Sequence, residues 1–156
     1  MVSTEQLRRY PFFGFLNHAQ LAEVAMITSE MEVPAETTLF AMGETAQFLF
    51  FLRTGGVDLH YVVIDENLPE LAQDFHVGTI NPGEVLGISA LIPPHKLTAT
   101  AIATADCTLF KIDAAALQAL CDDDHDLAYD LEKQIARTTM ERLNATRVLL
   151  AAASGP

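Results

Sequence analysis

Short apolar runs separated by turn residues fill the middle of the chain, from about residue 31 to residue 112, and this alternation most constrains the fold. The runs are rich in β-branched and aromatic residues, which favour strands. The expected strands are Met31–Val33, Thr38–Ala41, Gln47–Thr54, Val57–Ile64, Asp74–Ile80, Thr98–Ala103 and Cys107–Ile112. The pair Gly55-Gly56 predicts a tight hairpin, because glycine readily adopts the positive φ that such turns need. Regularly spaced strands of this kind are typical of an antiparallel sandwich or jelly roll.

Helical patterns flank the strands on both sides. Asn17 is a favourable N-cap for a helix over His18–Ser29, and Asp113 for one over Ala114–Leu120. A longer periodic segment, about residues 127–152, has apolar positions at near-heptad spacing, which favours packing on its own domain and on a partner helix. We therefore expect a mainly β protein with flanking helices, in a single domain over residues 1–156. The jelly roll would span about 31–112 and the C-terminal helices about 114–152.

The charge of the chain limits its partners. It has 21 acidic residues against nine Lys and Arg, a net charge of −12, which would repel nucleic acids and anionic membrane surfaces. It contains neither an apolar run long enough to span a membrane nor a basic segment followed by an apolar one at its start, so we expect a cytoplasmic protein. Motifs for a nucleophile elbow, a P-loop or a zinc site are missing, which argues against an enzyme.

One segment carries a family resemblance. Gly83–Leu91, followed by Leu97–Ala103, resembles the phosphate-binding cassette of cyclic-nucleotide-binding domains, roughly Gly-Glu-x-Ala-Leu and then Arg-Ser/Thr-Ala-x-Val-x-Ala. From about Tyr10 to Leu150 the chain resembles the sensor half of the bacterial cAMP receptor/fumarate-nitrate regulator family. That resemblance implies an eight-stranded jelly roll, a short helix in the cassette and a homodimer formed through a long C-terminal helix. Most transcriptional relatives continue into a helix-turn-helix domain, which would need roughly 60–80 residues more than this sequence has. We therefore expect a stand-alone domain without direct DNA contact.

Two positions depart from the family pattern. Ile88 stands where the ribose-binding glutamate is expected, and Leu97 where the phosphate-binding arginine is expected. The candidate ligand-binding residues of the cassette are Gly87, Ile88, Ser89, Ala90, Leu91, Leu97, Thr98 and Ala99. In the family, polar residues of the long helix meet the base of the nucleotide, often across the dimer. The candidates for that role are Thr138, Thr139 and Arg142, which otherwise set the dimer register or face solvent.

The function predicted from these residues is a regulatory sensor domain with altered ligand selectivity. It would bind a non-standard small ligand or act through its dimer and a regulatory protein partner. A second interpretation is a cAMP or cGMP receptor that uses backbone amides, Ser89, Thr98 and Lys96. A third is an adaptor whose pocket is filled by Ile88 and Leu97.

The histidines allow a further interpretation, a metal-dependent cupin-like enzyme. His60 and His76 lie on neighbouring expected strands and could face each other across a hairpin as metal ligands. The family resemblance implies a separate possibility, because some relatives bind haem through a histidine of this domain, and His76 is the candidate here. Because no His-x-His motif occurs, we expect no metal and no cofactor other than a possible cyclic nucleotide or similar small ligand.

Overall fold

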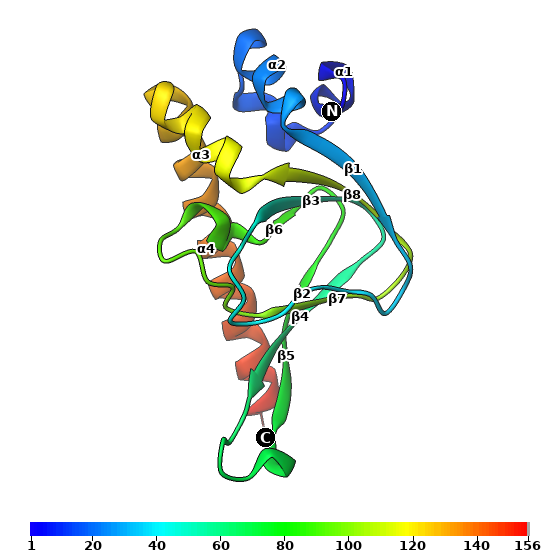
Figure 1. The fold of residues 1–156 in the computed structure, drawn as a ribbon. Coiled ribbons are helices and arrows are strands. Elements are labelled where there is room, and N and C mark those ends of the chain that lie inside the picture. The colour runs from blue at the N-terminus through cyan, green and yellow to red at the C-terminus, as the bar shows by residue number, and fades with distance from the viewer. Residues whose placement is uncertain (156) are drawn as a thin grey trace.

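The structure, a computed structural model that describes residues 1–155, consists of two antiparallel sheets with helices at both ends of the chain (Figure 1). The strands are β1 (Thr28–Val33), β2 (Thr38–Phe40), β3 (Phe48–Thr54), β4 (Val57–Val63), β5 (Gln73–Ile80), β6 (Val85–Leu86), β7 (Thr100–Ala103) and β8 (Cys107–Asp113). One four-stranded sheet has the order β1-β8-β3-β6 and the other β2-β7-β4-β5. This arrangement confirms the predicted jelly roll.

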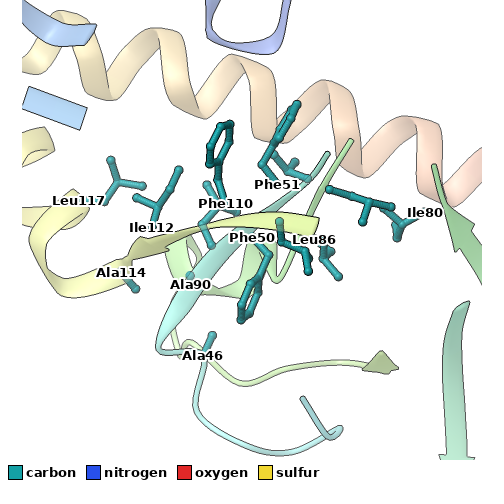
Figure 2. Packing of buried hydrophobic residues seen from close by; sticks show 14 of the residues in the cluster. Ala46, Phe50, Phe51, Ile80, Leu86, Ala90, Phe110, Ile112, Ala114 and Leu117 are labelled. Carbon is teal, nitrogen blue, oxygen red and sulfur yellow. The ribbon is translucent and has the colours of Figure 1, made fainter. Parts of the chain in front are cut away.

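The first sheet carries the aromatic centre of the core. Phe51 of β3 pairs in register with Phe110 of β8, and both are completely buried. Figure 2 shows these two rings on one side of the sheet and Phe50 on the other. Burial of several phenyl rings supplies much of the apolar area removed from water, and hence much of the driving force for folding.

The N-terminal segments cover this aromatic sheet. They are α1 (Thr4–Arg8), the 3₁₀ helix η1 (Pro11–Phe15) and α2 (His18–Met26). Tyr10 and Phe13 pack their rings on Phe51 and Phe110, at centroid distances of 4.9 to 6.3 Å. The aromatic stretch near the start of the chain is therefore core packing.

The predicted N-caps are confirmed, whereas one helix end is not. The Asn17 side chain accepts a hydrogen bond from the Gln20 N–H at 2.8 Å, and that of Asp113 accepts one from the Ala116 N–H at 2.8 Å. Helix α2 ends at Met26 rather than at Ser29, because Thr28 already begins β1 and pairs with Ile112 of β8. Tertiary strand pairing here outweighs the local helical pattern.

The C-terminal helices are α3 (Ala114–Asp123) and α4 (His125–Ala153), and α4 runs alongside the roll (Figure 1). Its buried residues, Leu127, Leu131 and Ile135, all lie in the first half of the helix. In the second half large apolar side chains are exposed, namely Met140, Leu143, Val148, Leu149 and Leu150. None of the helices formed by residues 1–155 is long and apolar enough to cross a membrane.

The two hairpin connections on either side of β4 differ in length. Gly55, in the predicted β3–β4 hairpin, has φ +100°, and a Cβ there would lie 2.6 Å from the Asp106 carbonyl oxygen. The longer β4–β5 connection contains the 3₁₀ helix η2 (Pro69–Leu71), and this hairpin extends away from the N-terminal helices beside the end of α4 (Figure 1).

Candidate ligand-binding site

A short 3₁₀ helix, η3 (Ile88–Leu91), forms one wall of the candidate site, as the resemblance implied. Gly87 caps it in the left-handed region, with φ +75°, and a Cβ at this position would lie 3.0 Å from the Phe48 carbonyl oxygen. Both the backbone conformation and the close approach of β3 therefore require glycine. Within the cassette, this turn connects the buried strand β6 to η3.

Side chains from two other segments hold η3 in place. The Gln118 side-chain amide of α3 donates to the Ala90 carbonyl oxygen at 2.8 Å. The His95 Nδ1 atom lies 3.2 Å from the Ser89 carbonyl oxygen. The last carbonyls of a helix have no partner within it, and the Gln118 amide supplies one for Ala90. The Ser89 carbonyl oxygen also accepts the Ile92 N–H at 3.2 Å, so the His95 contact is an additional one. The Gln118 hydrogen bond also connects the cassette to α3.

Helix α4 forms the opposite wall. Thr139, Arg142, Leu143 and Thr146 are spaced at i, i+3, i+4 and i+7, so they lie on one face of the helix. The Thr146 hydroxyl is 3.1 Å from the carbonyl oxygen of Val77 in β5, which fixes this part of α4 against the roll.

Between the two walls lies a cavity of about 280 Å³. It is lined by Phe40, Leu59, Gly87, Ile88, Ser89, Leu97, Thr98, Ala99, Thr139, Arg142, Leu143 and Thr146. Eight of the predicted site residues thus meet in one place. Of the other candidates, Ala90 is completely buried, Leu91 borders a separate hollow beside Cys121, and Thr138 is not part of the lining. Sequence reasoning missed Phe40, Leu59, Leu143 and Thr146.

Arg142 is the most unusual residue of the cavity. Its Nε and Nη2 atoms are buried, and neither finds a hydrogen-bond partner within residues 1–155. Burial lowers the pKa of the guanidinium from its usual value, opposed by the weaker influence of the Glu84 and Glu141 carboxylates. Since an arginine stays protonated at any ordinary pH, the protein carries a largely buried positive charge at this wall.

Comparison with known proteins gives the same family as the cassette resemblance. The family model described as "Cyclic nucleotide-binding domain" matches residues 30–124, well over half of the chain. The chain belongs to the cyclic nucleotide-binding domain family. No curated protein sequence matches it.

Solved structures extend the likeness of this cyclic nucleotide-binding domain to nearly its whole length. A putative cyclic nucleotide-binding protein from Geobacter metallireducens GS-15 is 31% identical, with a TM-score of 0.78 over 92% of this chain and 99% of that chain. The sensor domain of the transcriptional regulator DNR from Pseudomonas aeruginosa is 19% identical, with a TM-score of 0.69 over 90% and 91% of the two chains. The catabolite activator protein of Thermus thermophilus is 22% identical, with a TM-score of 0.67, and covers 92% of this chain and 63% of its own. The last two share the fold.

Apolar side chains occupy the two cassette positions at which the resemblance led us to expect an acid and a base. Leu97 is only 6% exposed and belongs to the hydrophobic core, whereas Ile88 is half-buried at the cavity wall. The side chain of the neighbouring Lys96 is directed elsewhere, because its Nζ donates to the Thr45 hydroxyl at 2.8 Å and it takes no part in the lining. The ammonium group of Lys96 therefore lies outside the lining of the cavity in this cyclic nucleotide-binding domain.

His60 and His76 face each other across the β4–β5 hairpin, as predicted, with ring centroids 5.9 Å apart. Each has its own partner: His60 Nδ1 lies 2.8 Å from Asp74, and His76 Nε2 lies 3.1 Å from Thr79 and 3.4 Å from Asp58. Within residues 1–155 no group of three or more His, Cys, Asp or Glu residues is arranged to hold a metal ion.

Proposed function

We propose that this domain is a cytoplasmic, non-enzymatic regulatory module that binds a small molecule other than a cyclic nucleotide. The proposed site is the cavity between the cassette and α4. One observation carries the proposal: a cavity bounded by both elements retains hydroxyl groups and a buried guanidinium, although Ile88 and Leu97 replace the acid and base of the family pattern.

The physical argument against a cyclic nucleotide concerns its phosphate and ribose. A charge-assisted hydrogen bond contributes about 1.5–3 kcal/mol, so losing the cassette arginine would weaken phosphate binding roughly ten- to over a hundred-fold. The apolar side chains of Ile88 and Leu97 also offer no hydrogen bonds to the groups they would meet. The remaining backbone amides of a four-residue helix would compensate little of this loss.

Calorimetric titration and thermal unfolding with cAMP, cGMP and a panel of small metabolites test the proposal. We expect neither nucleotide to bind at micromolar concentration and at least one other compound to raise the Tm. The variant Ala99→Trp, which fills the cavity, should abolish that shift. Ala105→Trp, in the exposed turn before β8, is the matched control and should retain it.

Two results would contradict this function. Micromolar binding of cAMP or cGMP would restore the cyclic-nucleotide interpretation. A response to ligand that survives Ala99→Trp would place the binding site outside this cavity.

We also propose that the domain forms a homodimer through the second half of α4. Support comes from its exposed apolar side chains, among them Met140, Val148 and Leu150, which would be removed from water by a second copy of the helix. Sedimentation analysis of Leu150→Asp should show a shift toward monomer, with Ala153→Asp as the control. A wild-type protein that sediments as a monomer at every concentration would overturn the dimer.

A further inference from the structure

The Arg142 guanidinium has two buried nitrogens without hydrogen-bond partners at the wall of an otherwise mainly apolar cavity. Buried charges in proteins are normally paired, because an isolated ion loses its hydration without receiving compensation. Arginine cannot escape this penalty by releasing its proton. A buried and unpaired guanidinium therefore indicates a partner that is not part of the folded chain.

We propose that Arg142 is the anion-binding residue of this cavity and that its ligand is an organic monocarboxylate with an apolar body. This inference rests on the proposed function, since it assigns a ligand class to the same cavity. It moves the positive charge of the site from the cassette to α4, three residues after Thr139.

The identity of the two free atoms favours a carboxylate. Nε and Nη2 are the pair of nitrogens on one edge of the guanidinium plane, and their parallel N–H bonds match the two oxygens of a carboxylate. A single planar anion would satisfy both nitrogens at once.

The rest of the lining favours one negative charge and an apolar remainder. Six lining side chains are apolar: Phe40, Leu59, Ile88, Leu97, Ala99 and Leu143. Arg142 is the single Lys or Arg among the lining residues, so a second negative charge on the ligand would have no counterion in this part of the described chain. The net charge of −12 further opposes a polyanion.

The polar groups nearest to Arg142 bond to other partners, and none of them accepts a hydrogen bond from its buried Nε or Nη2 atom. Burial lowers its pKa, and the Glu84 and Glu141 carboxylates oppose that shift through space without bonding to these two nitrogens. The Thr139 hydroxyl donates to the Ile135 carbonyl oxygen at 2.8 Å, and the Thr146 hydroxyl lies 3.1 Å from that of Val77. Glu84 accepts the Asn81 N–H at 2.7 Å in the β5–β6 turn. The guanidinium edge is left for a ligand.

Two matched pairs of probes test the charge directly: hexanoate against hexanamide, and phenylacetate against phenylacetamide. Each amide keeps the size and the apolar body of its acid but lacks the charge. We expect the acids to raise the Tm of the wild-type protein and to bind more tightly than the amides. Arg142→Gln should weaken acid binding by about ten- to a hundred-fold and leave amide binding unchanged.

Two further variants test whether acid binding depends on the charge alone, on the paired N–H groups, or on any arginine of α4. Arg142→Lys should retain part of the affinity for the acids, because it keeps the charge but loses the paired N–H edge. Arg147→Gln removes an exposed arginine from the same helix and should bind the acids like the wild type.

The outcomes distinguish the two proposals. Acids that bind Arg142→Gln as tightly as the wild type, but fail to bind Ala99→Trp, would overturn the role of Arg142 and leave the cavity as the ligand site. Cyclic nucleotides that bind in an Arg142-dependent manner would overturn the proposed function. If none of the four probes binds at millimolar concentration, the monocarboxylate assignment is wrong.

A measurement without any ligand adds an independent check. Arg142→Met keeps an unbranched apolar stem and removes the charged head. The ligand-free variant should therefore unfold at a higher temperature than the wild type, because an unpaired buried charge has been removed. A Tm lowered by several degrees would mean that the guanidinium is satisfied within the protein. Weaker self-association of this variant would place its partner in a second copy of the chain, and would also overturn the inference.

Discussion

Two arginines of this domain occupy opposite situations. The Arg53 side chain, in β3, donates from Nε to the Tyr10 hydroxyl at 3.1 Å and from Nη1 to Glu30 at 3.0 Å, and it lies over the Phe110 ring at 4.5 Å. Arg142 has buried nitrogens without such partners. The pKa of Arg53 is raised, chiefly by the Tyr10 hydrogen bond, whereas burial lowers that of Arg142. The first arginine is part of the fold, and the second is suited to a ligand.

The surroundings of the two arginines also differ: Arg53 lies against the closely packed core, and Arg142 lies beside a cavity. Around Arg53 the N-terminal cover and the β1-β8-β3-β6 sheet pack ring against ring, with Phe51 and Phe110 completely buried. Around Arg142 the cassette and α4 leave a cavity of about 280 Å³. The aromatic core and the cavity are thus at different sides of one small domain.

The largest expected effect is in the aromatic core. Phe51→Ala should lower the free energy of unfolding by about 3–5 kcal/mol, because it removes a buried ring and leaves a void. Chemical denaturation measures this, with Phe75→Ala, a residue 48% exposed in β5, as the control. A loss below about 1 kcal/mol would show that the aromatic side of the domain is not tightly packed.

A smaller effect is expected at the cassette. Gly83 and Gly87 both have positive φ but differ in the space around them. A Cβ added at Gly83 would meet nothing within 4 Å, whereas one added at Gly87 would lie 3.0 Å from the Phe48 carbonyl oxygen. Gly83→Ala should lower the free energy of unfolding by about 1 kcal/mol, and Gly87→Ala by about 2–3 kcal/mol. Equal losses for the two variants would contradict a close approach of β3 to the cassette.

The arginine pair itself comes next. Arg53→Gln should lower the free energy of unfolding by about 1–2 kcal/mol, since it removes a charge-assisted hydrogen bond and a cation–π contact. Arg142→Gln should cause no comparable loss in the ligand-free protein. If both substitutions destabilise the domain equally, the distinction between a structural and a ligand-binding arginine fails.

The smallest effect concerns pH. The Asp124 side chain accepts hydrogen bonds from the Gln20 amide at 3.0 Å and from the Asp126 and Leu127 N–H groups at 3.1 Å, and these bonds lower its pKa. The stabilisation is complete above the ordinary aspartate pKa and is lost as pH falls through the lower folded value. Below about pH 4 the stability of the wild type should therefore decline more steeply than that of Asp124→Asn. Identical acid profiles would exclude the effect.

Much of the fold was predictable, because turn residues and caps act locally. Asn17, Asp113 and the Gly55-Gly56 hairpin were found from residue type and spacing alone. Strand β6 was missed since two residues carry no periodicity, and α1 was missed although Ser3 and Gln6 form a capping box that the sequence displays.

The site was predictable in its members and not in its chemistry. The cassette resemblance selected six of the lining residues, and polarity within the long helix selected Thr139 and Arg142. The six are Gly87, Ile88, Ser89, Leu97, Thr98 and Ala99. Leu143 and Thr146 follow once the helix face is known, whereas Phe40 and Leu59 come from strands far away in the chain. Whether Arg142 has a partner depends on every element packed around it, and no local pattern encodes that.

The hydrogen bond from Gln118 to the Ala90 carbonyl oxygen has an evolutionary consequence. Because the acceptor belongs to the main chain, this hydrogen bond between α3 and the cassette does not depend on which side chains the cassette carries. Ile88 and its neighbours can be exchanged for others while this hydrogen bond persists. Proteins that descend from one such domain can therefore change their ligand preference while the hydrogen bond that positions η3 is kept.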